Sequence, residues 1–130
     1  HAKDYVEMQW KILQQKKADD FVISSGKSHS VKEFVNEVCS QLKMKIKWSG
    51  KGLNEKAELI KPNKKKEILI KVHKKYFRPL EVDYLRGNSS KALKQLKFKP
   101  KFNFKKLVSE MISEDLKLAK SEWLIKNSKK

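Results

Sequence analysis

The sequence predicts an α/β protein of the mixed α+β kind, and three observations support this prediction. Several segments repeat apolar residues at helical spacing, and shorter segments between them alternate apolar and polar residues as half-buried strands do. The predicted helices and strands do not follow each other in a regular βαβ rhythm. With 130 residues, 38% of them hydrophobic, the chain is long enough to bury a modest core.

The first part of the chain predicts two helices and a strand. Residues 3–16 carry a helical apolar stripe, and residues 21–24 are a short apolar run suited to a buried strand. The clearest helix begins at Ser30, an N-cap that Glu33 completes as a capping box. Its apolar face consists of Val31, Phe34, Val35, Val38, Cys39 and Leu42. Cys39 is therefore expected to be a core residue rather than a reactive thiol.

The middle of the chain predicts two strands that are separated by irregular structure. Residues 44–48 alternate apolar side chains with lysine, and residues 68–72 are rich in isoleucine, leucine and valine. Between them, glycine, asparagine, proline and lysine dominate, and no periodicity is visible. We predict a flexible loop over residues 49–67.

The last part of the chain predicts a short helix followed by a longer one. Asn88 or Ser89 can cap a helix that runs through Leu96, and Pro100 closes it. A final amphipathic helix begins near Phe104 and runs toward Trp123. The polar tail beyond it is expected to fray.

Lysine dominates the charge of the chain. The net charge is +17, with 32 lysines and arginines, of which only Arg78 and Arg86 are arginine. Such an excess suggests nucleic acid or an anionic membrane. However, nucleic-acid surfaces usually include arginine for bidentate contacts, and these lysines are spread along the whole chain. We interpret them as a compositional bias on solvated faces, and we expect neither nucleic acid nor a membrane as partner.

Other compositional features narrow the function classes. No apolar run reaches the length of a membrane span. The single cysteine excludes an internal disulfide and fits a reducing, cytoplasmic compartment. The sequence contains no Gly-x-Gly-x-x-Gly motif, no phosphate-binding Gly-Lys-Ser loop and no Gly-x-Ser-x-Gly elbow. His1, His29 and His73 lie far apart without ligand-spaced partners, so we expect surface histidines and no metal site.

Arg78 is the residue that most strongly suggests a ligand. Tyr76 and Phe77 precede it, and Pro79 follows it, which stiffens the backbone. Its guanidinium fork can chelate two phosphate oxygens, and the carboxylate of Glu81 can accept hydrogen bonds from the vicinal hydroxyls of a ribose. Together the two residues would bind a nucleoside diphosphate. A buried Arg78–Glu81 ion pair that stabilises a turn is the alternative, and the residues alone leave both interpretations open.

Four blocks of the sequence occur in the order of a known enzyme family. They are HAKDYVEMQWKILQQ (1–15), DDFVISSGKSHSVKEFV (19–35), YFRPLEVDYLRGNSSKAL (76–93) and LKFKPKFNFKKLVSEMISEDL (96–116). In this order they resemble GDP-mannose 4,6-dehydratases, which are extended short-chain dehydrogenases/reductases. The family usually has Leu-Gly-Trp-Lys-Pro where this chain has Leu96 to Pro100. The loss of that glycine predicts a helix end without the usual left-handed cap.

The resemblance implies a role for the chain and for its arginines. Residues 1–130 would be the small C-terminal sugar-nucleotide-binding domain, without the N-terminal Rossmann domain that binds NADP in this family. Arg78 would hold the diphosphate of GDP-mannose and Glu81 the guanosine ribose hydroxyls, while Arg86 would have a surface or structural role. No tyrosine here has a lysine four positions later, so no catalytic residue and no cofactor are expected in this chain.

The implied reaction is the NADP-dependent conversion of GDP-mannose to GDP-4-keto-6-deoxymannose by internal redox and loss of water. The intact enzyme is expected to be a homo-oligomer, and this chain alone is expected to be inactive. Two alternatives stay open. One is a related nucleotide-sugar reductase or epimerase that shares the arginine and the acid, and the other is a basic nucleic-acid-binding module.

Overall fold

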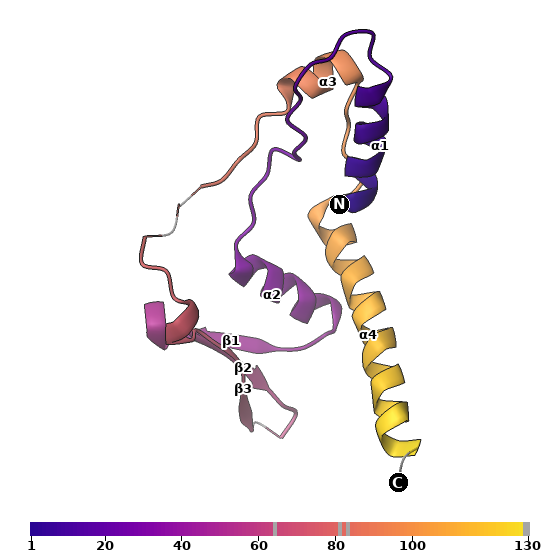
Figure 1. Cartoon of the computed structure of the whole chain (residues 1–130). Helices are drawn as coiled ribbons and strands as arrows, with labels where there is room; N and C mark the ends of the chain where they lie inside the picture. Colours follow the sequence, from indigo (N-terminus) through magenta and orange to yellow (C-terminus); the bar gives the residue numbers. More distant parts are fainter. Residues whose placement is uncertain (64, 81, 83, 129–130) are drawn as a thin grey trace. The chain divides into compact units, whose positions relative to one another are not determined.

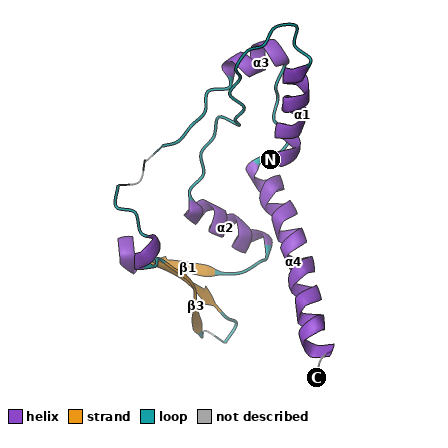
Figure 2. Cartoon of the chain, in the orientation of Figure 1, coloured by secondary structure: helices purple, strands orange, loops and turns teal. Residues whose placement is uncertain are grey.

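The computed structural model describes residues 1–63, 65–80, 82 and 84–128 (Figure 1). The chain divides into two compact units. One comprises His1–His29 and Tyr84–Lys130, and the other comprises Ser30–Asp83. The described residues form helices and one antiparallel sheet (Figure 2), which confirms the predicted mixed α+β class.

Helices dominate the first unit. They are α1 (Ala2–Leu13), α3 (Ser90–Leu96) and α4 (Phe104–Ser128), and all three confirm helices predicted from the sequence. The core of the unit consists of Met8, Ala92, Leu96 and Phe98, against which Ile12, Phe21 and Ile23 pack. α4 continues past Trp123 to Ser128, so the helix end expected near Trp123 is wrong, while the fraying of the tail stays a prediction. Residues 124–128 contain neither proline nor glycine, so the sequence has no strong helix breaker in this extension.

The prediction of a strand over residues 21–24 is wrong. Within the described part of the chain these residues pair with no other strand. Alternate side chains, Phe21 and Ile23, pack against the core, which accounts for the apolar run in the sequence. The Ser24 hydroxyl donates a hydrogen bond of 2.7 Å to the carbonyl oxygen of Gly87. The Ser24 side chain, rather than backbone strand pairing, therefore connects this segment to the chain around Gly87.

The second unit packs a helix with a small sheet. Its elements are α2 (Val31–Gln41), β1 (Ile46–Ser49), η1 (Gly52–Asn54), β2 (Lys56–Ile60), β3 (Lys66–Lys71) and η2 (Lys74–Tyr76). The strands are antiparallel in the order β1-β2-β3. Ala57 of β2 lies opposite Trp48 on one side and Ile70 on the other, and it is fully buried.

The start of α2 is capped as predicted. The Ser30 hydroxyl accepts a hydrogen bond from the Glu33 N–H at 3.1 Å, and the Glu33 carboxylate accepts one from the Ser30 N–H at 2.8 Å. These two bonds satisfy N–H groups that have no partner within the helix. Cys39 is 3% exposed, which confirms that it is a core residue.

The prediction of a loop over residues 49–67 is wrong for much of its length. β2 lies inside this segment and pairs on both sides, and β3 begins at Lys66. The sequence pattern did not indicate β2, because its only fully buried residue, among those described, is the small Ala57. The neighbouring Lys56 and Glu58 form an ion pair of 2.9 Å, and such charged residues are uncommon in strands. The flexibility of the segment stays a prediction.

The expectation that α3 ends without a left-handed residue is also wrong. Lys97 follows α3 with φ 54° and ψ 37°, the conformation that glycine usually adopts at this position. The N–H groups of Lys97 and Phe98 donate to the carbonyl oxygen of Ala92. Lys43 has φ 55° after α2, where the Met44 N–H reaches the Cys39 oxygen at 2.8 Å. Lysine thus occupies both left-handed helix ends, and its side chain is exposed at both.

Candidate functional site

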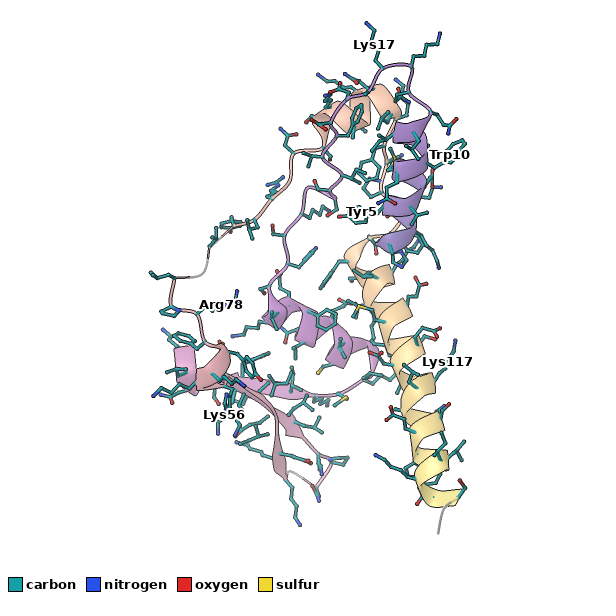
Figure 3. The ribbon with its side chains drawn as sticks, viewed as in Figure 1. Tyr5, Trp10, Lys17, Lys56, Arg78 and Lys117 are labelled. Carbon is teal, nitrogen blue, oxygen red and sulfur yellow. The ribbon has the colours of Figure 1, made fainter. Side chains whose placement is uncertain are left out.

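Arg78 lies two residues after the end of η2 and is exposed (Figure 3). The chain remains attached to the sheet almost up to this point, because the Val72 N–H donates to the Glu55 carbonyl oxygen at 3.0 Å. Pro79 follows at once and fixes its own φ. The arginine is therefore presented on a short segment between a turn attached to the sheet and a proline.

Local hydrogen bonds stiffen the turn that precedes Arg78. The ring nitrogen Nδ1 of His73 accepts from the Lys75 N–H at 3.3 Å, and the His73 carbonyl oxygen accepts from the Tyr76 N–H at 2.9 Å. The Phe77 N–H donates to the Lys74 carbonyl oxygen at 3.3 Å. The rings of His73 and Tyr76 lie 5.7 Å apart, centroid to centroid. These hydrogen bonds therefore restrain the backbone that leads into the arginine.

The same turn concentrates positive charge next to exposed aromatic surface. Lys74, Lys75 and Arg78 are cations within one stretch of five residues. The Lys75 ammonium lies 5.6 Å from the Tyr76 ring centroid, and Tyr76 is 74% exposed. Cations attract phosphate groups, and an exposed ring offers a face on which a flat group can stack. The turn thus suits a ligand that carries both anionic and planar groups.

Glu81, the predicted acceptor for ribose hydroxyls, lies outside the described residues. The pairing of Arg78 with Glu81, as ligand-binding partners or as an ion pair, stays a prediction. Arg86, for which we predicted a surface or structural role, is exposed.

Two serine hydroxyls hold the chain that follows the predicted site. The Ser28 hydroxyl donates to the Leu85 carbonyl oxygen at 2.8 Å, and the Ser24 hydroxyl donates to Gly87 as described above. A Cβ atom at Gly87 would lie 2.8 Å from both the Cβ and the Oγ of Ser24, so this approach requires glycine. Sequence reasoning missed this contact. The glycine in LRGNSS was the one local signal for it.

Asp4 of the HAKDYV block is a structural residue that sequence reasoning also missed. It is 6% exposed, and its carboxylate accepts hydrogen bonds from the N–H groups of Lys101 at 3.1 Å and Phe102 at 3.3 Å. Only Asn103 separates these residues from α4. The carboxylate therefore fastens α1 to the segment that leads into α4, within the first unit. An acidic residue on the buried face of a helix was the available signal.

The histidines and the cysteine have structural surroundings. His29 and His73 are exposed as predicted, but the His1 side chain is only 10% exposed. The expectation of a surface histidine is wrong there, because His1 stacks on Phe102 at 3.9 Å and its Nε2 lies 2.8 Å from the Glu110 carboxylate. Burial raises the pKa of the Cys39 thiol. A thiol with a raised pKa is a poor nucleophile at neutral pH.

In the part of the chain that the structure describes, we find neither a cluster of metal ligands nor a helix that could span a membrane. No group of three or more histidine, cysteine, aspartate or glutamate side chains could hold a metal ion there. None of its helices is both long enough and apolar enough to cross a membrane.

Comparisons with known proteins match nearly the whole chain. A family described as GDP-mannose 4,6 dehydratase matches residues 1–111. The GDP-mannose 4,6 dehydratase of Dictyostelium discoideum is 43% identical over 121 residues, which cover 93% of this chain and 33% of that protein. The Homo sapiens enzyme of the same name is 41% identical over 121 residues, 93% of this chain and 32% of its own length. The Yersinia enterocolitica GDP-mannose 4,6-dehydratase is 41% identical over 133 residues, 97% of this chain and 36% of its own. The chain thus spans about a third of the length of the curated relatives that it matches.

Proposed function

The chain belongs to the GDP-mannose 4,6-dehydratase family, and from this premise we propose that it is the C-terminal, sugar-nucleotide-binding portion of such an enzyme. The whole enzyme would be a lyase that converts GDP-mannose to GDP-4-keto-6-deoxymannose. The family match over residues 1–111 is the observation that carries the proposal. The stiff, cationic turn that presents Arg78 supports it.

The cofactor site is proposed to lie outside this chain. The sheet described here is antiparallel, whereas a dinucleotide-binding crevice forms at the carboxyl ends of parallel strands. The sequence also lacks the glycine-rich motif that approaches a pyrophosphate and the Tyr-x-x-x-Lys pair. The residues present therefore do not fit NADP, and we derive no chemical step from them. The isolated chain should not turn over GDP-mannose.

The contribution of this chain is substrate binding and positioning. The Arg78 guanidinium would grip two oxygens of the GDP diphosphate, and Glu81 would accept from the guanosine ribose hydroxyls. Binding energy from these nonreacting parts of the substrate holds the hexose in the reactive orientation. A guanidinium fork on a stiff turn loses little entropy when it binds, which favours arginine over lysine at this position.

The proposed whole enzyme would work in the cytoplasm as a homo-oligomer, with no role for nucleic acid or membranes. The single, buried cysteine fits a reducing compartment. A salt titration addresses the nucleic-acid alternative, since binding through lysines would weaken steeply as salt rises. Strong, salt-dependent DNA or RNA binding without affinity for GDP would favour that alternative.

The experiment that tests the proposal joins this chain to the remaining two-thirds of the Yersinia enterocolitica relative. We expect the joined protein to convert GDP-mannose, and Arg78→Ala to lower kcat/KM about 100-fold, chiefly through KM. This follows from roughly 3 kcal/mol for a charge-assisted bidentate contact. Arg78→Lys tests the geometry at constant charge, and Arg86→Ala is the matched control that should leave the kinetics unchanged. Equal kinetics for wild type and Arg78→Ala would remove the phosphate-binding assignment.

A further inference from the structure

The side chain of His73 caps the turn that leads toward Arg78. η2 (Lys74–Tyr76) begins directly after His73, whose backbone is extended at φ −110° and ψ 132°. The ring nitrogen Nδ1 of His73 accepts a hydrogen bond of 3.3 Å from the Lys75 N–H. Aspartate and asparagine usually make this contact, from a side-chain oxygen to the N–H group two residues further on. Here an imidazole, which can gain a proton, takes the place of the usual oxygen.

The accepting nitrogen requires one protonation state of the ring. An imidazole nitrogen accepts a hydrogen bond only through a free lone pair, so Nδ1 carries no proton in this contact and Nε2 carries it. A protonated imidazole has an N–H group at both nitrogens. The Nδ1–H group would then face the Lys75 N–H, and two donors cannot form a hydrogen bond with each other. The cap therefore exists only while His73 is neutral.

The neighbouring charged residues offer no replacement for the cap. On the turn and on the strand ends attached to it, they are Glu55, Lys56, Lys71, Lys74 and Lys75. The carboxylate of Glu55 binds the Lys32 ammonium at 2.7 Å. Among the described residues, the side-chain interactions of His73 are the contact with Lys75 and a tilted ring contact with Tyr76. An ion pair with a described carboxylate therefore does not compensate for a lost cap.

The conformation of this turn determines how Arg78 is presented. Only Phe77 separates Arg78 from the end of η2, and the Phe77 N–H donates to the Lys74 carbonyl oxygen at 3.3 Å. Without the cap, the Lys75 N–H has lost its partner and the turn is less stable. A ligand that needs the ordered turn then binds more weakly, in proportion to the fraction of molecules that retain it.

We propose that His73 is a pH-sensitive positioning residue for the diphosphate site. The neutral ring caps the turn and holds Arg78 in its binding position, and protonation of Nδ1 releases the turn. Histidine is the side chain that ordinarily changes its charge between about pH 5 and 8. Substrate binding should therefore weaken as the pH falls through this range. The inference rests on the proposed function, and His73 acts through the turn rather than on the substrate.

Protonation also adds a positive charge near the diphosphate, which acts in the opposite direction. Lys74 and Lys75 already supply two cations in this turn, and the charge of an exposed ring is screened by salt. At about 0.5 M salt the Debye length is only about 4 Å. An N-cap shifts the equilibrium of the element that it caps about fivefold. In raised salt the loss of the cap therefore outweighs the added charge.

The first test is NMR on the ¹⁵N-labelled chain of 130 residues. A hydrogen bond between two nitrogens transmits a scalar coupling. We expect such a coupling between the Lys75 backbone nitrogen and His73 Nδ1 at about pH 8, where a histidine is ordinarily neutral, and its loss at about pH 5. This measurement needs no ligand, so it tests the cap independently of the proposed function.

The second test measures KM for GDP-mannose in the joined protein described above, at the same two pH values and about 0.5 M salt. The asparagine oxygen of His73→Asn accepts from the Lys75 N–H at either pH. The KM of the wild type relative to His73→Asn should therefore rise about fivefold on acidification, with an unchanged ratio of kcat. His73→Lys is charged at both pH values and cannot cap, so its KM should exceed that of His73→Asn at both.

Each contrary result removes a part of the proposal. No coupling at pH 8, or a coupling that persists at pH 5, excludes the pH-sensitive cap. A constant KM ratio means that the cap does not position Arg78, and a ratio that falls on acidification means that the added charge dominates. Equal KM values for His73→Lys and His73→Asn lead to the first of these conclusions. If Arg78→Ala leaves KM unchanged, the proposed function fails and the positioning role with it, while the coupling still decides whether His73 caps the turn.

Discussion

The Asp4 carboxylate should contribute more to stability than its position in a surface helix suggests. It is 6% exposed and accepts two backbone hydrogen bonds, of 3.1 Å from Lys101 and 3.3 Å from Phe102. A hydrogen bond to a charged group contributes about 1.5–3 kcal/mol, and these lengths favour the lower end of that range. Asp4→Ala should therefore lower the free energy of unfolding by about 3 kcal/mol.

Thermal unfolding followed by circular dichroism measures this loss. For a chain of this size, about 3 kcal/mol corresponds to a fall of roughly 10 °C in Tm. Asp4→Asn keeps an oxygen acceptor but loses the charge, so it should lie between wild type and Asp4→Ala. Glu114→Ala is the matched control, since it removes the same charge from an exposed position of α4.

The comparison between the variants decides the result. If Asp4→Ala unfolds within 2 °C of Glu114→Ala, the carboxylate does not fasten the segment before α4. An equal loss for Asp4→Asn and Asp4→Ala would mean that the charge, rather than the oxygen geometry, supplies the whole effect.

Three further predictions use separate parts of the chain. Gly87→Ala should destabilise the protein by about 1–3 kcal/mol in urea unfolding, because the new Cβ would clash with Ser24; an unchanged midpoint would contradict the close approach. The side-chain hydrogen bond from Lys101 lowers the pKa of Glu7 below its ordinary value of 4.5, so its stabilisation is present above that pH and lost as pH falls through the folded pKa. Tm measured against pH should fall less steeply in Glu7→Gln, and parallel curves would exclude this contribution. Lys97→Gly should raise stability by about 0.5–1 kcal/mol by relieving the left-handed conformation, whereas Lys97→Ala should not; equal denaturation midpoints for the two would show no strain at this residue.

The helices could be predicted because their signals are local. The capping box at Ser30 and Glu33 and the apolar stripe of α2 lie within one segment, so no knowledge of the rest of the fold is needed. A strand forms only with a hydrogen-bonded partner strand, and the local sequence does not identify that partner. Residues 21–24 resemble a strand but pack as irregular chain, and residues 56–60 resemble a loop but pair on both sides. Residues 21–24 are held by residues far away in the sequence, such as Gly87, whereas residues 56–60 pair with the strands directly before and after them. In both places the partner, and not the local residue types, decided the outcome.

The candidate site likewise has features that the local sequence predicts and contacts that it does not. The stiff backbone around Arg78 was predictable, since Tyr76, Phe77 and Pro79 are its neighbours in sequence. The anchoring contacts join residues more than 50 positions apart, as the Ser28 hydroxyl with Leu85 shows. Neither residue type nor spacing reveals such a contact before the fold is known.

The lysine bias of the chain bears on why residue 78 is arginine. Lysine stands even at the left-handed ends of α2 and α3, at Lys43 and Lys97, where glycine is the less strained residue. Because this chain uses lysine even where the backbone conformation is strained, lysine would also be expected at an exposed turn. Arg78 is exposed and lies beside Lys74 and Lys75, so a further positive charge alone would not require arginine. The planar fork is the property that lysine lacks. Nothing in the structure explains the arginine at position 86. Arg78→Lys, which keeps the charge and removes the fork, is therefore the substitution that separates chelation of a diphosphate from general attraction to an anion.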